Sequence, residues 1–535
     1  MFHQLLTPVA GNLVLSFLVA AVPIAVVLVL LGVLKRPAWQ ASLAGLAAAL
    51  VIAVTVWKLP VGLALDSAAA GATFALWPVM WIVFNALVLY NVAVASGRFD
   101  AFRRWVVGSL PNDRRVVLAV IGFCFGALLE GVAGFGAPVA ITSALLIALG
   151  FKAVDAVVFT LMFNTAPVAF GALGAPVTTL GAVTGLPDHL LGAMIGRQLP
   201  FFALLLPFYV IGVYGGLRSI RALWPVLLVA GGSFALAQFA ASNLLRYELT
   251  DVISSMAALL CTVAFLKVWK PAPDPDFAFA RPPVEAAPDR AEVPAWQGWI
   301  PWIVITAMVI GWTTLKINLL GQQKIEWPGL HNAVFITLYN QPYAAVWTFQ
   351  PLATGTAILF AAAVTATAVG VGPRGFARAV GETWVQIRLA VLTVALIVAL
   401  AYLMNYSGLA YTLGLGVASA GALFPLLSAF LGWLAVFLSG SDTSGNALFG
   451  NLQVVAARQL NLNPLLIAAT NSSGGVMGKM ISPQNISTGC CSTPELKGQE
   501  GVVLARTFKH SVVLTLLLGL LVLLQQYVFR WMIPG

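Results

Sequence analysis

Apolar runs long enough to cross a bilayer recur along the chain, and no other feature constrains its fold as strongly. The first three runs are Asn12–Leu34, Trp39–Trp57 and Asp66–Ala95. A transmembrane helix needs about 20 mostly apolar residues, because it must cross about 30 Å of hydrocarbon with its backbone polar groups paired internally. Only 9% of the residues are charged, against about a quarter in soluble domains. The sequence therefore predicts an all-α polytopic membrane protein with about 12 transmembrane helices.

Basic residues predict which loops face the cytoplasm. The segment 98–115 holds five arginines against Asp100 and Asp113, and lysine and arginine concentrate in cytoplasmic loops. Lys35 and Arg36 fall on the same side of the predicted membrane, which places the N-terminus outside. Because cytoplasmic loops account for the net charge of +10, we do not infer a nucleic-acid partner.

Two glycine-containing stretches share a layout at an offset of 309 residues. The first is GALLEGVAGFGAPVAITSALLIA at Gly126–Ala148, and the second is AVFLSGSDTSGNALFGNLQVV at Ala435–Val455. The offset aligns glycines of the two stretches, Gly131 with Gly440 among them. Broken apolar segments at corresponding positions of two halves are typical of transporters built from inverted repeats, and they indicate the binding site.

The first of these stretches is too short to cross the membrane twice. Its first arm, Val116–Glu130, has 15 residues and reaches about 22 Å at a rise of 1.5 Å per residue. The second arm, Pro138–Gly150, is shorter, and three glycines and a proline in GVAGFGAP interrupt the helix between them. We therefore predict a re-entrant hairpin over 116–150 that enters from the cytoplasm, and a second one over 423–459 that enters from outside.

The predicted organisation is an inverted repeat with a connecting segment. The first repeat, 1–215, is expected to hold three spans, the hairpin 116–150, a broken span 153–177 and a span 190–215. The segment 216–298 is expected to form a connecting helix pair and a cytoplasmic linker. The second repeat, 299–535, is expected to contain the hairpin 423–459, a broken span 464–483 and a span 511–531. The two spans are expected to break at Asn164–Pro167 and at Asn471–Gly475.

Helices that stop inside the membrane leave unpaired N–H groups, whose positive dipole end suits a carboxylate. Polar side chains and glycines at the predicted breaks can bind such an anion and hydrogen-bond a hydroxyl group. The predicted substrate-binding residues are Gly134, Gly136, Asn164, Thr165, Ser441, Thr443, Ser444, Gly445, Asn446, Asn471, Ser472 and Ser473. The pattern predicts a small, polar, anionic solute.

Charged residues at membrane depth are rare and are functional candidates by default. Glu130 and Asp442 lie at the two predicted hairpin tips, where either can carry a coupling proton. The alternative is a local role, such as pairing or capping a half-helix, for which Asp442 is suited. Lys479 and Arg197 are candidates to neutralise a substrate carboxylate, although a lysine at the end of a span can also extend to the interface.

The chain carries no motif of a familiar enzyme. We find no Walker-type phosphate loop, no aspartate-rich metal pair, no Gly-x-Ser-x-Gly elbow and no His-Glu-x-x-His. We therefore expect no catalytic residue, no metal and no cofactor.

Four motifs together resemble the bacterial lactate permease family. They are GALLEGVAGFGAPVAITSALLIALGF at Gly126–Phe151, FNTAPVAFGALGAP at Phe163–Pro176, SGSDTSGNALFGNLQ at Ser439–Gln453 and ATNSSGGVMGKMISPQNI at Ala469–Ile486. The resemblance implies a multi-pass protein of the bacterial inner membrane that takes up L-lactate, D-lactate and glycolate with protons. It also implies a layout similar to the wider ion-transporter group with paired re-entrant hairpins, in which a transport domain moves against a scaffold.

Several readings stay open from the sequence. The first is proton-coupled symport of lactate and related 2-hydroxy monocarboxylates. The alternative within the same architecture is a sodium-coupled carrier of another carboxylate, such as a dicarboxylate. A membrane-embedded enzyme acting on a lipid or isoprenoid and a channel are readings from other classes. The expected partners are a small carboxylate, a proton and the lipid bilayer, and a homodimer is left open.

Overall fold

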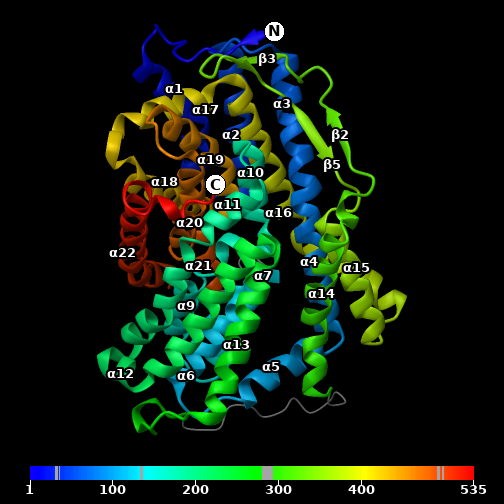
Figure 1. Cartoon of the computed structure of the whole chain (residues 1–535), viewed down its shortest axis with the longest axis vertical. Coiled ribbons are helices and arrows are strands. Elements are labelled where there is room, and N and C mark those ends of the chain that lie inside the picture. The colour runs from blue at the N-terminus through cyan, green and yellow to red at the C-terminus, as the bar shows by residue number, and fades with distance from the viewer. Residues whose placement is uncertain (31–33, 35, 133–136, 280–292, 491–493, 497–498) are drawn as a thin grey trace.

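The computed structural model describes residues 1–535 except 31–33, 35, 133–136, 280–292, 491–493 and 497–498. Helices dominate the molecule, as the apolar runs predict (Figure 1). Within the described residues, eight helices are long and apolar enough to cross a membrane, or nine if one bent pair counts as a single span. The polytopic helical class is therefore confirmed, while the number of about 12 spans stays a prediction.

The first five helices lead from one end of the long axis to the other. The N-terminus lies at the end that carries β3, and α5 lies at the opposite end (Figure 1). A π-helical turn, η2, joins two of these helices, and Trp77 inside it has extended backbone angles. The bounds are α1 (Leu13–Leu28), α2 (Ala38–Thr55), α3 (Val61–Phe74), η2 (Ala75–Met80), α4 (Trp81–Ala95) and α5 (Arg98–Gly108).

Two helical arms occupy the first predicted hairpin, and we call them hairpin 1. The first arm runs continuously through α6 (Arg114–Val117), η3 (Leu118–Phe125) and α7 (Gly126–Val132). The second arm is α8 (Ala137–Ala148). The expected tip residues Gly134 and Gly136 lie outside the described residues.

The next predicted span is broken, as expected. Helix α9 (Ala153–Phe163) stops at Asn164, and η4 (Val168–Phe170) and α10 (Gly171–Thr184) continue at an angle of 66°. Ala172, Leu173 and Gly174 have positive φ angles of 45°, 53° and 78°, so the backbone is unwound at the start of α10. Such irregular backbone at membrane depth is tolerated where it is buried in protein or lines a cavity.

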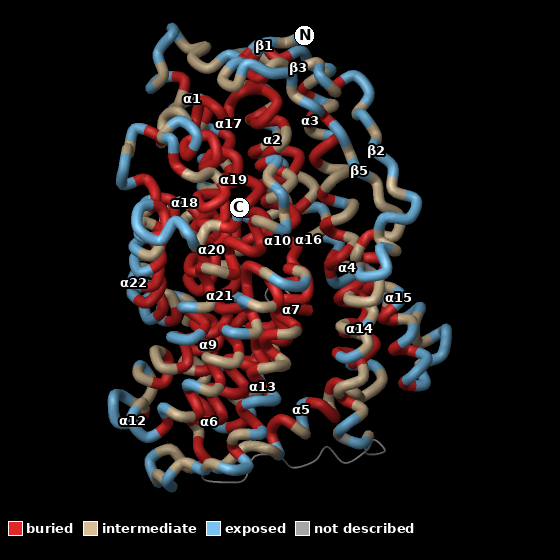
Figure 2. Tube along the Cα trace, in the orientation of Figure 1, coloured by how far each residue is buried: buried red, intermediate tan, exposed pale blue. Residues whose placement is uncertain are grey.

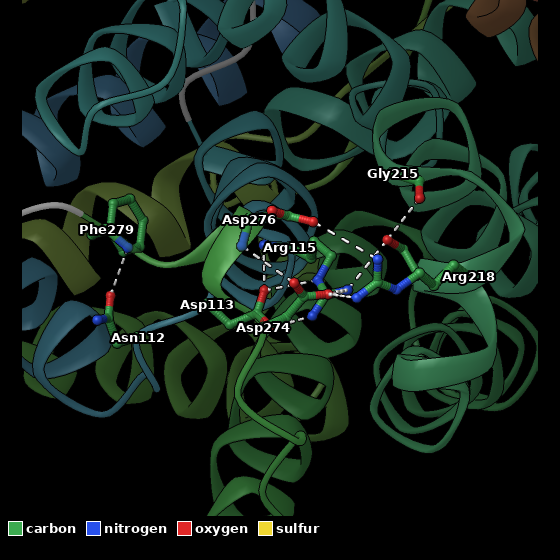
Figure 3. A network of polar contacts seen from close by, with 9 residues as sticks. Asn112, Asp113, Arg115, Gly215, Arg218, Asp274, Asp276 and Phe279 are labelled. Carbon is green, nitrogen blue, oxygen red and sulfur yellow. Dashed lines mark hydrogen bonds and ion pairs between the residues drawn. The ribbon is translucent and has the colours of Figure 1, made fainter.

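The connecting pair and the linker follow. Helix α12 (Leu199–Leu244) folds back at Gly216, whose φ of 70° suits glycine. The remaining helices of this part are α11 (Asp188–Ile195), η5 (Tyr247–Leu249), α13 (Thr250–Val268) and η6 (Pro275–Phe277). Part of the linker thus docks on the protein: Asp274 forms an ion pair with Arg115 at 3.3 Å (Figure 3).

The segment 323–349 contains short strands, so the chain is not purely helical. Strand β1 (Phe2–His3) pairs in parallel with β3 (Val334–Ile336), which pairs with β4 (Gln341–Pro342). Strands β2 (Gln323–Glu326) and β5 (Val346–Phe349) form an antiparallel pair. The flanking helical elements are η7 (Ala295–Trp299), α14 (Ile300–Thr314), η8 (Ile317–Leu319), α15 (Thr354–Ala368), α16 (Pro373–Ser407), α17 (Leu409–Val417) and η9 (Ala418–Leu423).

The second predicted hairpin is formed by α18 (Phe424–Ser439) and α19 (Asp442–Gln459), which we call hairpin 2. Gly440, with φ 71°, makes the turn between the two helices. The chain then continues through α20 (Pro464–Lys479), α21 (Pro483–Cys490), η10 (Pro494–Leu496), α22 (Glu500–Tyr527) and η11 (Arg530–Met532).

The prediction of a break at Asn471–Gly475 is wrong. Helix α20 is continuous through these residues, and the helix stops only after Lys479. The glycines there serve packing instead, because a Cβ atom at Gly474 would overlap the carbonyl oxygen of Ala429 in α18. Small residues of this kind let membrane helices approach closely. The backbone change therefore falls at Met480–Ser482, just before α21.

Buried residues concentrate where α7, α10, α19 and α20 lie, while α12, α22 and the strands expose many of theirs (Figure 2). In α19, every residue from Asp442 to Ala457 is buried. The center of the molecule is therefore built from the two hairpins and the helices that follow them.

Candidate functional site

The two hairpins meet at a small central cavity of about 30 Å³. Its walls come from α7, η4, the unwound start of α10, the turn of hairpin 2 and the last residue of α20. The lining residues are Glu130, Val168, Gly171, Ala172, Pro176, Gly440, Ser441, Asp442, Thr443 and Lys479. We call this space the central cavity.

A buried ion pair joins the two halves of the chain at this cavity. Lys479 Nζ donates to Glu130 Oε1 at 2.6 Å, and the two side chains are 6% and 3% exposed. Asn164 Nδ2 donates to the other oxygen, Glu130 Oε2, at 2.9 Å. Lys479 also ends α20, where the negative pole of the helix dipole favours a cation. The charged groups predicted at positions 130 and 479 are thus in contact, and hydrogen bonds compensate their burial.

Asp442 also lines the cavity, in the first turn of α19. Its Oδ2 accepts from Ser472 Oγ and, at 3.2 Å, from Asn446 Nδ2. Its Oδ1 has no hydrogen-bond partner in the described part of the protein, although it is buried. The helix cap is Ser441, whose hydroxyl accepts from the Ser444 backbone, so Asp442 does not serve as the cap.

A network of amides fixes hairpin 2 against its neighbours. Asn471 Nδ2 donates to Asn446 Oδ1 at 2.9 Å, and Gln453 Nε2 donates to Asn471 Oδ1 at 2.7 Å. Asn446 Nδ2 also donates to the carbonyl oxygen of Pro176, at 3.2 Å, on α10. These contacts connect α19, α20 and the broken span, so the network holds the cavity wall in place.

The other predicted substrate-binding residues that the structure describes do not line the cavity. Ser473 Oγ donates to Gln198 Oε1 at 2.7 Å, and Gly445 packs closely against Val436. Thr165 is buried with a hydroxyl that has no partner among the described residues. Of the twelve residues predicted to bind substrate, Ser441 and Thr443 line the cavity directly.

Arg197 lies elsewhere. Its Nε donates to Asn243 Oδ1 at 2.7 Å and its Nη1 donates to the carbonyl oxygen of Met532 at 3.0 Å. It lines a separate cavity of about 620 Å³ together with Asp188 and Arg246. The Arg197 guanidinium group therefore binds the C-terminal segment to α12, next to the end of α11.

Sequence reasoning missed Asp251, Gln198 and Gln453, which are all buried in this region. The one available signal for Asp251 was a carboxylate at the start of an apolar run with no basic neighbour. Gln198 lies in the turn before α12 and Gln453 lies in α19, and the sequence around them gives no hint of which partner they contact. Within the described ranges, no group of three or more His, Cys, Asp or Glu residues is arranged to hold a metal ion.

A buried lysine and two carboxyl groups where two membrane hairpins meet define a membrane transporter rather than a structural membrane protein, because ionisable groups at this depth mark solute and ion pathways. The chain belongs to the L-lactate permease family, whose sequence profile matches residues 16–529. It is accordingly a multi-pass protein of the inner membrane.

Curated relatives are similar over almost the full length. The chain is 41% identical to the glycolate permease GlcA of Escherichia coli K12 over 98% of each chain. It is also 41% identical to the L-lactate permease of the same organism, again over 98% of each chain. A solved structure, the YdaH transporter of Alcanivorax borkumensis, is similar with a TM-score of 0.45 and 14% identity over 87% of this chain and 88% of that one.

Proposed function

We propose that the protein takes up lactate and related 2-hydroxy monocarboxylates, such as glycolate, by symport with protons. Its equal identity to a glycolate permease and to an L-lactate permease supports this substrate class without separating the two solutes. We accordingly place its activity in transport and not in catalysis.

The buried Lys479–Glu130 pair is the observation that carries the proposal. A substrate carboxylate that enters the cavity needs the Lys479 ammonium group, which Glu130 occupies. If Glu130 stayed ionised, two carboxylates would share one cation in a site with little water, which is costly. If Glu130 takes up a proton, the site stays neutral and Lys479 is free for the substrate. Charge balance thus links one proton to each anion.

Groups of hairpin 2 suit the 2-hydroxyl of the substrate. Ser441 and Thr443 line the cavity with hydroxyl groups, and the unpaired Asp442 Oδ1 can accept a hydrogen bond. The first turn of α19, beginning at Asp442, adds backbone N–H groups that favour an anion.

The cavity must enlarge to admit the substrate. Its volume of about 30 Å³ exceeds the roughly 10–15 Å³ that one water needs, but does not reach the volume of a six-atom acid. We propose that the hairpins separate at their tips to open the cavity, and that the hairpin-bearing part moves against the remaining helices during transport. In this scheme, the two halves form the inverted repeat predicted from the sequence.

The first experiment measures uptake of radiolabelled L-lactate into proteoliposomes with an imposed inward proton gradient and no sodium. We expect accumulation that a protonophore abolishes and that unlabelled D-lactate or glycolate competes. Uptake that requires sodium would instead favour the sodium-coupled carrier of another carboxylate. Downhill flux without accumulation would indicate a channel.

The variant Glu130→Gln tests the coupling group. We expect it to lose proton-driven accumulation while retaining exchange of labelled for unlabelled lactate, because the neutral amide imitates the protonated acid during exchange. Lactate binding should also lose the increase at lower pH that protonation of Glu130 gives the wild type. Glu382→Gln, on the exposed surface of α16, is the control and should behave as wild type. Unchanged accumulation in Glu130→Gln would exclude Glu130 as the proton site.

A further inference from the structure

Asp251 is a deeply buried carboxyl group with no evident structural task. It lies in the first turn of α13 and is 1% exposed. Neither of its carboxyl oxygens has a hydrogen-bond partner in the described protein. Burying an ionised carboxylate without a hydrogen-bond partner costs much free energy, whereas burying a protonated carboxyl group costs much less. An unsatisfied buried polar group in a native protein needs a specific explanation.

The position of Asp251 brings it next to the coupling pair. Helix α13 packs on α7 at Gly131, where an added Cβ atom would lie 2.7 Å from Asp251 Cβ. The glycine therefore permits the close approach, and the preceding residue in the chain is Glu130. The charged groups that act on the Asp251 carboxyl are Glu130 on α7 and Lys479 on α20. On the adjoining η5, Glu248 is already paired with Arg246.

The balance of charges in the center requires protons on its buried acids, because three acids face one cation and a neutral center holds protons on two of them. Glu130, Asp251 and Asp442 are buried there, and Lys479 is the cation that faces them. Glu130 is held by Lys479 and Asn164, and Asp442 accepts from Ser472 and Asn446. Asp251 accepts no hydrogen bond from the described residues. Of the three acids, Asp251 is thus the one for which ionisation is least compensated.

We propose that Asp251 is a second proton-binding site, from which Glu130 receives its proton when a substrate carboxylate takes the place of Glu130 on Lys479. The proton leaves an Asp251 Oδ atom and joins the Glu130 Oε atom that Lys479 releases. Asp251 remains as a carboxylate until a proton from water restores it, so one proton enters per anion and no other reactant is needed. This inference rests on the proposed proton coupling. Asp251 acts through Glu130 and does not touch the substrate.

The variant Asp251→Asn keeps the size of the side chain and removes the proton. We expect proton-driven net uptake of L-lactate in proteoliposomes to fall by about tenfold or more, since positioned proton transfer typically contributes at least that much. Exchange of labelled for unlabelled lactate needs no net proton transfer and should be retained. The increase of lactate binding at lower pH should also be retained, because Glu130 is still present. Ser254→Ala, in the same helix, is the matched control and should keep wild-type net uptake.

The outcomes separate this inference from the proposed function. Asp251→Asn with wild-type net uptake overturns the relay and leaves proton coupling intact. Loss of both exchange and net uptake in folded Asp251→Asn also overturns it, because substrate binding would then depend on Asp251. Asp251→Glu supplies a second variant: partial recovery of net uptake supports the relay, and a rate equal to that of Asp251→Asn contradicts it. A wild type without any proton coupling would instead refute the proposed function itself.

Discussion

At the scale of single residues, the central cavity depends on one charge pair between positions 130 and 479. Lys479 and Glu130 are both buried and lie 2.6 Å apart. Breaking a buried pair by removing one partner costs about 3–5 kcal/mol, because the remaining charge loses its compensation, whereas removing both charges costs much less.

We therefore expect Lys479→Met to lower the free energy of unfolding by about 3–5 kcal/mol and to abolish lactate binding. The double variant Glu130→Gln/Lys479→Met should recover most of the stability and none of the binding. Thermal unfolding of the purified protein in detergent and binding of radiolabelled lactate measure the two effects. Lys509→Met, on the exposed surface of α22, is the neutral control. Equal stability of the single and double variants would contradict a stabilising ion pair.

At the scale of elements, hairpin 2 is held by glycine contacts between α18 and α20. An added Cβ atom at Gly432 would overlap the Asn471 carbonyl oxygen, and one at Gly478 would overlap the Trp433 carbonyl oxygen. Gly474 and Gly478 are four residues apart on one face of α20. This spacing lets two membrane helices pack with their backbones in close contact.

Gly478→Ala should destabilise the protein by about 1–3 kcal/mol, because the methyl group meets backbone that cannot move out of its way. It should also displace Lys479, the next residue, and so weaken lactate binding. Gly311→Ala in α14 is the matched control: nothing lies within 4 Å of its added Cβ, and helix propensity favours alanine by up to about 1 kcal/mol. The comparison requires thermal unfolding and lactate binding of both variants. Equal effects at the two positions would refute the packing role.

At the scale of the whole molecule, the linker is attached to the base of hairpin 1. Arg115 is fully buried, donates to Asp113 at 2.7 Å and pairs with Asp274 of the linker at 3.3 Å. Its guanidinium group also stacks on the Phe277 ring at 4.2 Å. Figure 3 shows these acids and Arg218 converging from three segments. The linker thus connects hairpin 1 to the turn of α12.

Asp274→Asn should release this part of the linker, because it removes the charge that Arg115 and Arg218 share. We expect faster proteolytic cleavage and faster amide hydrogen exchange over residues 271–279. Asp276→Asn is the control: Asp276 and Arg218 are 75% and 74% exposed and 3.7 Å apart, and a surface pair of this kind contributes about 0–1 kcal/mol. If both variants left the segment equally protected, the ion pairs would not be what holds the linker.

That the two hairpins are re-entrant stays a prediction. The sequence by itself determined the helical membrane class, the helix pairs of hairpin 1 and hairpin 2, and the break after α9. Each follows from a local property: the length of an apolar run, or a glycine or proline that interrupts a helix. Asn164–Pro167 was predicted as a break for this reason, and the structure has it. The same local signals misplaced the break in α20, because glycines that look like helix breakers serve to pack α20 on α18.

Only the tertiary structure decided which charges meet. Glu130 and Lys479 are 349 residues apart, and their contact depends on how hairpin 1 and α20 pack. Packing likewise places Arg197 against Met532, away from the cavity, and Asp251 beside Gly131. Helix breaks are set by neighbours in the chain, whereas the partner of a buried charge is set by the elements that fold around it.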